Sequence, residues 1–369
     1  NYDEVSRLPA GNRQSRLCNC LMVKVLELKS NLISNLWFSN VNGDVNVIIF
    51  KKKILMSNQF NHFLADDQLN KSQLLALIEL AIKIKTNPTD YNQALAGKSV
   101  AMIFEKPSLR THVSFDMGIN KLGGHALYLG QQNGKLGERE RVSDYAKNLS
   151  CFADAIVARV FSHDSIQGLA KHGSVPVINA LCDVYHPCQA LADFVTLTEL
   201  LPTLNKSDVS DVKLAYVGDG NNVSNSLMIM AAILGVDFTL LTPTGYEAQT
   251  DIVKTTQALA NESGAKLTIT TDVEAIGEQD VIYTDTWISM GDEDASKKAQ
   301  ILAHFAPYQV NHQLMTTAKA SVVMHCQPAH LEEEITTELF DSEMAVVFQQ
   351  AENRMWAQNA VLVSLFKSL

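Results

Sequence analysis

An apolar run that is followed at once by a helical pattern is the feature that most limits how this chain can fold. Residues 99–104 have the character of a buried strand, and the residues from Leu109 to Phe115 have the pattern of a helix. Strand patterns recur at 125–129, 155–159 and 175–179, with helical patterns between them. This alternation predicts an α/β fold in which a parallel sheet is flanked by crossover helices.

A second series of strand patterns predicts a second parallel sheet. Its strands are expected at 213–217, 237–241, 266–270, 281–284 and 321–325. A helix from about Pro187 to Leu200 leads from the first series to the second, and 351–369 has the pattern of an amphipathic helix. A chain of 369 residues with 46% hydrophobic content is long enough for two such domains, which we place at 56–200 and 201–350.

Residues 1–55 differ from the rest of the chain. They show weak periodicity and end in three lysines just before Met56. Our hypothesis is that Met56 is the native start and that 1–55 is upstream sequence read through, with a disordered extension as the alternative. The acidic residues argue against a transit peptide, and the apolar run 45–50 is too short to span a membrane.

Composition limits the partners and the compartment. A formal net charge of -10 argues against nucleic acid and anionic membranes, so an anionic ligand would need a local basic cluster. The cysteines are Cys18, Cys20, Cys151, Cys182, Cys188 and Cys326, and their spacing fits neither a disulfide framework nor a zinc site. A reducing, cytoplasmic location is therefore expected.

The first turn of the helix after residues 99–104 is a candidate phosphate site. Ser108, Arg110 and Thr111 stand there, and Pro107 suits the start of a helix because proline lacks an N–H. Free backbone N–H groups and the positive end of the helix dipole favour an anion at such a place. A capped helix that happens to contain an arginine is the alternative.

Four more clusters of reactive residue types fall at or just after the ends of expected strands. They are Arg159, the run from His186 to Gln189, the run from Asp285 to Gly291, and the run from His325 to Pro328. Open parallel sheets bind their ligands at the carboxyl ends of their strands. Each cluster alone also fits a loop or an inert core residue, whereas together they predict one active site.

These motifs, in this order, resemble those of the aspartate/ornithine carbamoyltransferase family, and most closely its ornithine enzymes, over about Asn61–Leu369. The family's phosphate motif Ser-x-Arg-Thr-Arg matches residues 108–111 and departs at His112. The matches to its other motifs are His-Pro-x-Gln at 186–189, Asp-x-x-x-Ser-Met-Gly at 285–291, His-Cys-Leu-Pro at 325–328 with Gln327 in place of leucine, and Glu-Asn-Arg at 352–354.

The resemblance implies an enzyme that moves the carbamoyl group of carbamoyl phosphate to the δ-amine of L-ornithine, giving citrulline and phosphate in arginine biosynthesis. The first domain would bind carbamoyl phosphate and the second ornithine, and the last helix would pack back on the first domain. By resemblance the carbamoyl phosphate ligands are Ser108, Leu109, Arg110, Thr111, Lys135, Arg159, His186, Gln189, Cys326, Gln327 and Arg354. Those for ornithine are Asn222, Asp285, Ser289 and Met290, and the catalytic residues are Arg159, His186, Asp285, Cys326 and Arg354.

The same resemblance implies a homotrimer with sites at subunit interfaces and no metal or organic cofactor. Lys135 lies where ornithine enzymes commonly have a glutamine that reaches the neighbouring subunit's site, and aspartate enzymes use a lysine in that loop. His112 would weaken the phosphate field if it stays neutral and an arginine charge is needed there. Gln327 is expected to act through its backbone carbonyl, so its side chain is of small consequence.

Two other classes of protein and three other acceptors remain as alternatives. The run from Val217 to Val223 lies between a strand and a helix like a dinucleotide-binding turn, although the third glycine and the acid after the next strand are missing. A non-catalytic relative is the second alternative class. Within carbamoyl transfer, putrescine, N-acetylornithine and aspartate are the alternative acceptors.

Overall fold

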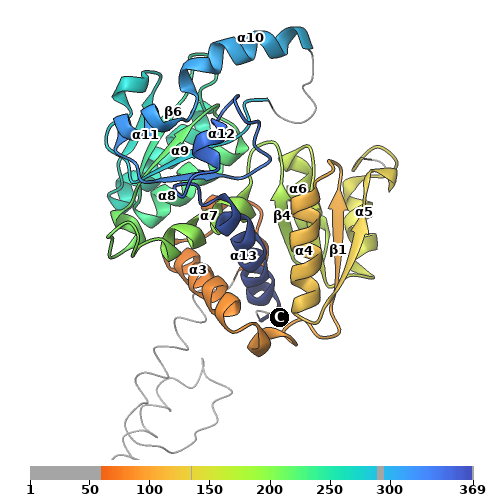
Figure 1. Ribbon diagram of the computed structural model, residues 1–369. Coiled ribbons are helices and arrows are strands. Elements are labelled where there is room, and N and C mark those ends of the chain that lie inside the picture. The colour runs from red at the N-terminus through yellow and green to blue at the C-terminus, as the bar shows by residue number, and fades with distance from the viewer. Residues whose placement is uncertain (1–59, 134, 289–294, 368–369) are drawn as a thin grey trace, which may run out of the picture. The chain divides into compact units, whose positions relative to one another are not determined.

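The computed structural model describes residues 60–133, 135–288 and 295–367. The expected α/β class is confirmed, because two parallel sheets alternate with helices along the chain (Figure 1). The prediction for residues 1–55 lies outside the described residues. The strands are β1 (Ser99–Phe104), β2 (His125–Leu129), β3 (Ala155–Arg159), β4 (Val177–Leu181), β5 (Lys213–Val217), β6 (Asp237–Leu241), β7 (Leu267–Thr270), β8 (Val281–Thr284) and β9 (Val322–His325).

Helices of two kinds connect and cover these strands. The α-helices are α3 (Lys71–Thr86), α4 (Leu109–Lys121), α5 (Val142–Ser150), α6 (His163–His172), α7 (Pro187–Glu199), α8 (Asn222–Leu234), α9 (Thr250–Ser263), α10 (Ala295–Phe305), α11 (His312–Ala318), α12 (Thr337–Phe340) and α13 (Val347–Lys367). The 3-10 helices are η3 (Asp66–Gln68), η4 (Pro88–Tyr91), η5 (Gln131–Asn133), η6 (Val209–Asp211), η7 (Val273–Ala275) and η8 (Ala306–Tyr308). None of the helices described here is long and apolar enough to span a bilayer.

The first sheet has the strand order β2-β1-β3-β4, and the second has the order β7-β6-β5-β8-β9. Every strand pair in both sheets is parallel. The direction of the strand order reverses between β1 and β3 in the first sheet and between β5 and β8 in the second. Such reversal points leave a crevice at the carboxyl ends of the strands, where α/β proteins bind ligands.

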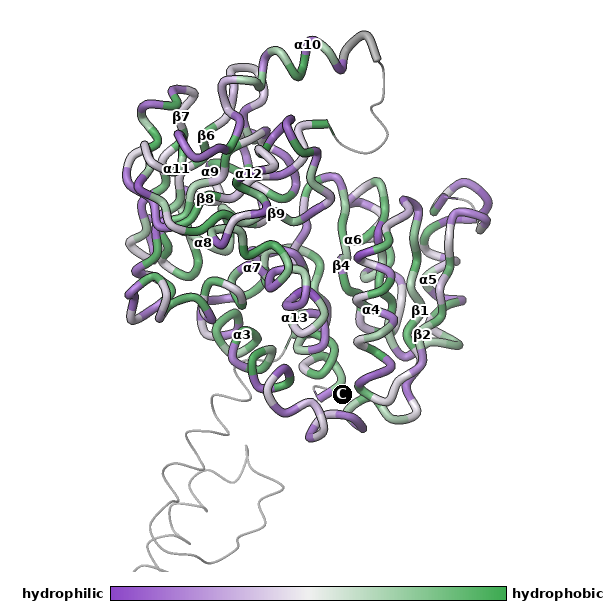
Figure 2. The backbone as a smooth tube through the Cα atoms, viewed as in Figure 1, coloured by the Kyte–Doolittle hydropathy of each residue, from purple (hydrophilic) through white to green (hydrophobic). Residues whose placement is uncertain are grey.

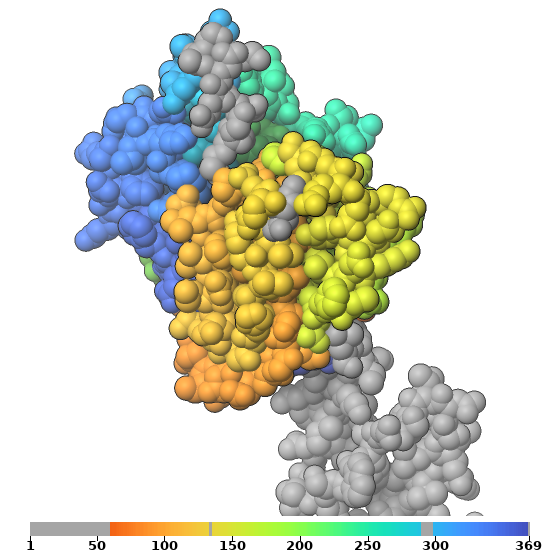
Figure 3. Space-filling view, turned by 90° about the vertical axis from the view of Figure 1, so that its right-hand side faces the viewer, coloured from red at the N-terminus to blue at the C-terminus, as the bar shows by residue number. Residues whose placement is uncertain are grey.

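Helix α13 packs back on the first sheet's helices, as expected. It contacts α3, α4 and α7, although it follows the whole second sheet in sequence. We call residues 60–205 together with α13 the N-half, and residues 206–346 the C-half. Figure 3 shows the surface formed by the β1–α6 part of the N-half, in orange and yellow.

The last helix differs from its expected bounds and character. It begins at Val347 rather than Ala351, is described as far as Lys367, and is not simply amphipathic. Residues 356–363 are all buried, including Gln358 and Asn359, because three other helices surround this part of α13. A helix enclosed on several sides buries polar positions that a surface helix would expose.

Three strands were also misplaced by the sequence patterns. β4 covers Val177–Leu181 rather than 175–179, because Pro176 has no N–H to donate and the pairing continues past a bulge to Leu181. β7 and β9 each begin one residue later than expected. The central strands are largely hydrophobic, which Figure 2 shows as green tube, and they are almost fully buried.

Candidate active site

The start of α4 has the geometry expected of a phosphate site. Ser108 is the N-cap residue, and its Oγ accepts a hydrogen bond from the Thr111 backbone N at 3.3 Å. The same hydroxyl donates to Thr111 Oγ1 at 3.0 Å. Strand β1 ends at Phe104, so this turn lies at the carboxyl edge of the first sheet beside the end of β3. The expected strand–turn–helix arrangement is thus present.

Two arginines from distant parts of the chain converge on Thr111. Arg159, the last residue of β3, donates from Nη1 to Thr111 Oγ1 at 3.3 Å. Arg354, from α13, donates from Nη2 to the same oxygen at 3.0 Å. Both guanidinium groups are buried, and each has an Nε without a hydrogen-bond partner. Two buried cations therefore meet at the phosphate turn.

The electrostatics of this cluster favour an anion. Burial, followed by the repulsion of Arg354, lowers the pKa of Arg159 to about 9, and Arg110 contributes further repulsion. Burial also lowers the pKa of Arg354. Among the ion pairs of the described residues, none joins Arg110, Arg159 or Arg354 to a carboxylate. Uncompensated buried charge is costly, so the cluster is suited to a ligand that brings negative charge.

His186, just before α7, belongs to the same cluster. Its Nε2 lies 3.1 Å from Arg354 Nη2, and a guanidinium can only donate, so this ring nitrogen is the acceptor. Burial, with the charges of Arg354 and Arg159, lowers the pKa of His186 well below its ordinary value. The imidazole is therefore neutral and carries its proton on Nδ1, which is buried without a partner. This N–H is a free donor for a ligand.

Gln189 joins the cluster from the first turn of α7. Its Oε1 accepts a hydrogen bond from Arg354 Nη1, and its Nε2 donates to Asp193 Oδ1 at 2.7 Å. Asp193 also accepts from Gln350 Nε2 at 2.8 Å. Sequence reasoning found Gln189 but missed Asp193 and Gln350.

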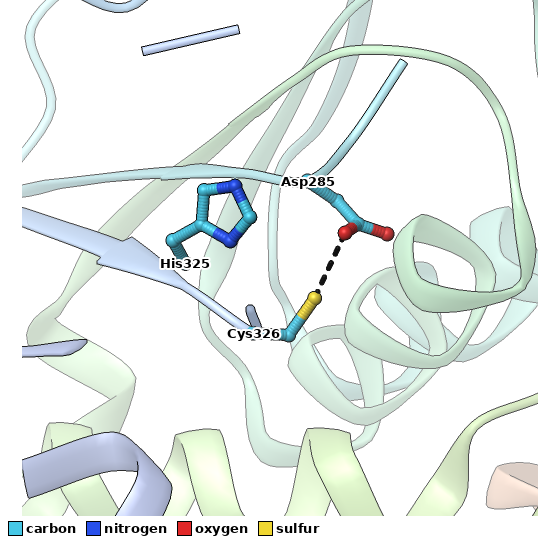
Figure 4. Close-up of side chains that lie close together, drawn as sticks. All are labelled: Asp285, His325 and Cys326. Carbon is cyan, nitrogen blue, oxygen red and sulfur yellow. Dashed lines mark hydrogen bonds between the residues drawn. The ribbon is translucent and has the colours of Figure 1, made fainter. Parts of the chain in front are cut away.

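The second cluster lies at the carboxyl edge of the second sheet, as Figure 4 shows. Cys326, directly after β9, donates from Sγ to Asp285 Oδ1 at 3.0 Å, and Asp285 directly follows β8. Burial, with the nearby Asp285, raises the pKa of the Cys326 thiol well above its ordinary value. The thiol is therefore protonated at neutral pH and acts as a donor to the carboxylate.

His325 supports the Cys326 turn from behind. Its Nε2 lies 2.9 Å from Glu334 Oε1, and both side chains are fully buried. Its Nδ1 accepts from the backbone N of Gln327 at 2.9 Å, which holds the start of the expected motif in place. Asp285, His325 and Cys326 have metal-ligand atoms within 4.8 Å of one another, but His325 and Cys326 already use these atoms in the contacts above.

Of the residues predicted to bind ornithine, the structure describes Asn222 and Asp285. Ser289 and Met290 lie outside the described residues. Asn222, the first residue of α8, donates from Nδ2 to the backbone oxygen of Cys182 at 2.6 Å, which ties the C-half to the N-half. Its neighbour Asn221, which sequence reasoning missed, donates to Asp285 Oδ2 at 3.3 Å and caps α8.

The glycine-rich turn before α8 has a packing explanation. A Cβ atom at Gly220 would lie 2.2 Å from the backbone N of Ala248, so the close approach of two backbones requires glycine there. This removes the main reason for the nicotinamide alternative, which already lacked the third glycine and the ribose-binding acid.

Two departures from the family motifs have definite surroundings. The ring of His112 stacks on Tyr128 of β2 with centroids 4.1 Å apart, and it makes none of the hydrogen bonds around Thr111. The ammonium of Lys135 lies 4.9 Å from the ring centroid of Phe161, which Lys106 approaches to 4.6 Å. Lys135 is exposed and likewise takes no part in the Thr111 contacts.

A pocket of about 640 Å³ joins the two clusters. Its lining includes Leu109 and Arg110 of α4, Gln189 of α7, and Arg354 of α13 from the N-half, with Cys326 from the C-half. Most of the residues predicted for carbamoyl phosphate and for catalysis thus surround one space or contact its lining.

Family models match almost all of the described chain. The model for the carbamoyl-P binding domain of aspartate/ornithine carbamoyltransferase matches residues 61–199, and the model for the Asp/Orn binding domain matches residues 210–365. An ornithine carbamoyltransferase of Shewanella oneidensis is 59% identical over 305 residues, which are 83% of this chain and 99% of the relative. One from a Vibrio species is 55% identical over 306 residues, with the same shares covered.

Solved structures agree with these matches. The ornithine carbamoyltransferase of Pyrococcus furiosus has a TM-score of 0.78 and 41% identity, covering 84% of this chain and 98% of that one. The anabolic enzyme of Campylobacter jejuni also has a TM-score of 0.78, with 34% identity, covering 84% of this chain and all of the other.

Proposed function

Because this chain belongs to the aspartate/ornithine carbamoyltransferase family, we propose that it transfers the carbamoyl group of carbamoyl phosphate to L-ornithine. The products are L-citrulline and phosphate, and the reaction is a step of arginine biosynthesis. The observation that carries this proposal is the convergence of Arg159 and Arg354 on Thr111, at the N-terminus of α4.

In the proposed mechanism, the phosphate binds at the start of α4. Ser108, Arg110 and Thr111 hold it, with the backbone N–H groups of the first turn, including that of Leu109. Gln327 contributes through its backbone carbonyl, and Cys326 lines the same space. The two orphan Nε donors of Arg159 and Arg354 supply further hydrogen bonds to the ligand.

Fixed donors around the carbonyl then stabilise the transition state. The δ-amine attacks the carbonyl carbon, a C–N bond forms, and the carbonyl oxygen becomes an oxyanion. Arg159 and the neutral His186 are the donors to this oxygen, and donors held before the reaction need no reorganisation as the charge develops. Collapse of the intermediate breaks the C–O bond, and phosphate leaves with the electron pair and takes up the proton that the attacking nitrogen loses.

The C-half is proposed to hold the amino acid. Asp285 pairs with the α-ammonium, whereas Asn222, Ser289 and Met290 provide neutral donors for the α-carboxylate. Asn222 uses one amide hydrogen on Cys182, which leaves the other for this carboxylate. Cys326 orients Asp285 and lies beside the attacking amine, which is nucleophilic only once it has lost its proton.

We further propose the assembly and location that the resemblance implied. The carbamoyl phosphate domain comprises residues 56–200 with the last helix, and the ornithine domain comprises 201–350. The protein acts as a homotrimer in the cytoplasm, with Lys135 reaching the site of a neighbouring subunit. Supporting the location, four cysteines of the described residues are free. An active monomer in sedimentation experiments would refute this role of Lys135.

A side-by-side assay tests the function. Carbamoyl phosphate is supplied with L-ornithine, putrescine, N-acetylornithine or L-aspartate, and kcat/KM is measured for each. Putrescine lacks the carboxylate, and N-acetylornithine lacks the ammonium, so each leaves charged or polar groups of the site unpaired. Ornithine should be the best acceptor, and a higher kcat/KM for any of the other three would refute the proposal.

A further inference from the structure

We propose that Asp193 is a positioning residue that sets the specificity for the carbamoyl group by fixing the orientation of the Gln189 amide. This inference rests on the proposed function, because it concerns the group that is transferred. Asp193 lies four residues after Gln189 on α7, and both side chains are buried.

Two hydrogen bonds, one to Asp193 and one from Arg354, together fix which end of the amide faces the ligand. Gln189 Nε2 lies 2.7 Å from Asp193 Oδ1, which also accepts from Gln350 Nε2. Burial raises the pKa of Asp193 to about 7, and the proton of the acid form belongs on Oδ2, which has no partner among the described residues, so Oδ1 accepts in both forms. The NH₂ group of Gln189 must therefore face Asp193. Its Oε1 is left on the other side, where it accepts from Arg354, and Gln189 and Cys326 both line the pocket.

The same carboxylate oxygen orients a second amide. Gln350 Nε2 donates to Asp193 Oδ1 at 2.8 Å, so Gln350 Oε1 is free to accept from the backbone N of His325 at 2.9 Å. His325 directly precedes Cys326, which lines the pocket on the C-half side. Asp193 thus accepts from two buried amides of the N-half, and the second of these contacts the C-half at His325.

An oxygen facing the ligand distinguishes an NH₂ group from a methyl group. The carbamoyl NH₂ can donate to Gln189 Oε1, whereas acetyl phosphate has the same phosphate and carbonyl but a methyl group in place of the amine. Gln189 Oε1 already accepts from Arg354, so the methyl group would leave only its second lone pair without a donor, and the lost hydrogen bond weakens binding. If the Gln189 amide were flipped, its NH₂ group would face the NH₂ group of the carbamoyl moiety. The preference for carbamoyl phosphate over acetyl phosphate would then be lost.

The experiment compares the dissociation constants of carbamoyl phosphate and acetyl phosphate, measured by calorimetry without ornithine. The unaltered protein should bind acetyl phosphate about 10- to 100-fold more weakly. Asp193→Leu, which has no acceptor, should reduce this ratio to within about threefold. Asp193→Asn can place its oxygen at the position of Oδ1, so it should retain most of the ratio.

Three controls separate positioning from a general loss of structure. Thr196→Val removes another buried hydrogen bond of α7, to Asn353, and should leave the ratio unchanged. Gln189→Ala should abolish the preference by itself, and Asp193→Leu should then reduce it no further. If Asp193→Leu does not fold, Asp193→Thr, whose hydroxyl is too short to replace the carboxylate, is measured in its place.

The outcomes are distinct. If Asp193→Leu weakens both ligands equally, or if Asp193→Asn loses the preference as fully as the leucine variant, the inference is wrong. If the unaltered protein makes no citrulline, the proposed function fails instead. Citrulline formation with an unchanged ratio in Asp193→Leu overturns the role of Asp193 alone.

Discussion

The two clusters of the site gather charges of opposite sign. In the N-half, Arg159 and Arg354 lie together in a buried place without a carboxylate partner among the described ion pairs. In the C-half, Asp219 accepts from Asn221 Nδ2 at 3.0 Å, and burial and the nearby Asp285 raise its pKa to about 7. Burial and Asp285 also raise the pKa of the Cys326 thiol. Each cluster carries internal repulsion that a ligand of the opposite charge would relieve.

This difference shows how the charges of a site can direct two substrates to different places in it. Under the proposed function, a phosphate dianion would relieve the repulsion in the N-half, and an α-ammonium would relieve it in the C-half. Neither ligand would be stable in the other cluster. The predictions below therefore alter one cluster at a time and ask whether only the matching substrate is affected.

The largest effect is expected from Arg110→Ala. The loss of one charged donor to the phosphate should cost about 2.7–4 kcal/mol of transition-state stabilisation, a fall of about 10²- to 10³-fold in kcat. Steady-state kinetics with both substrates measure this. Arg141→Ala, which removes an exposed arginine paired with Asp144, is the matched control and should change kcat little. Activity within a few-fold of the parent in folded Arg110→Ala would rule out the phosphate role.

Asp285→Asn should have the next largest effect, and this effect should be on ornithine rather than on carbamoyl phosphate. Loss of a charged partner for the α-ammonium is expected to raise the KM for ornithine by about 10- to 100-fold. The KM for carbamoyl phosphate should change little, because Asp285 belongs to the acidic cluster. Equal changes in both KM values would contradict the separation of the two clusters.

Cys326→Ala should have a smaller effect, about tenfold in turnover, because it removes the thiol that donates to Asp285. Cys326→Ser keeps a hydroxyl donor and should recover part of the loss. The measurement is kcat/KM against pH. A role beside the amine predicts a shift of the alkaline limb in the alanine variant, whereas an inert core cysteine would lower the melting temperature and leave the kinetics unaltered.

Among these variants, Asp66→Asn should change turnover least. Its main effect should be on the pH dependence of the free energy of unfolding. Asp66 lies where the halves meet and accepts from Ser226 Oγ at 2.5 Å, and burial raises the pKa of its carboxyl from its ordinary value of 3.8 to about 7. The folded state therefore favours the protonated acid, and this contribution to stability is lost as pH rises from about 3.8 towards 7.

The asparagine amide of this variant stays neutral at every pH between about 4 and about 8. Relative to the parent, the variant's free energy of unfolding should be similar near pH 4 and higher by about 4 kcal/mol near pH 8. Urea denaturation at both pH values measures the difference. A variant that is destabilised more at pH 8 than at pH 4 would show that the ionised form of Asp66 is the one that the fold prefers.

The sequence predicted the parts of the site that follow strands. Arg159, Asp285 and Cys326 stand at or directly after strand ends, so the parallel-sheet rule was enough to place them on one edge. Arg354 was found only by its motif, because nothing in its local pattern shows that α13 returns to the N-half.

The residues that support the site were harder to find. Asp193 and Gln350 meet across 157 positions of sequence, and no local pattern encodes that contact. Spacing gave a signal that was not used: Asp193 follows Gln189 by four residues, and Gln350 precedes Arg354 by four, so each pair shares a helix face. An aspartate within the apolar run of α7 also indicated a buried polar group that needed partners.

The return of α13 to the N-half means that the two halves are not separable modules. A fragment ending near residue 205 would lack Arg354 and would leave bare the faces of α3, α4 and α7 that α13 covers. To exchange the N-half between two related proteins, both of its sequence segments, 60–205 and α13, would have to be exchanged. A chimera with a single crossover between the two sheets would instead take α13 from one parent and the helices that α13 contacts from the other.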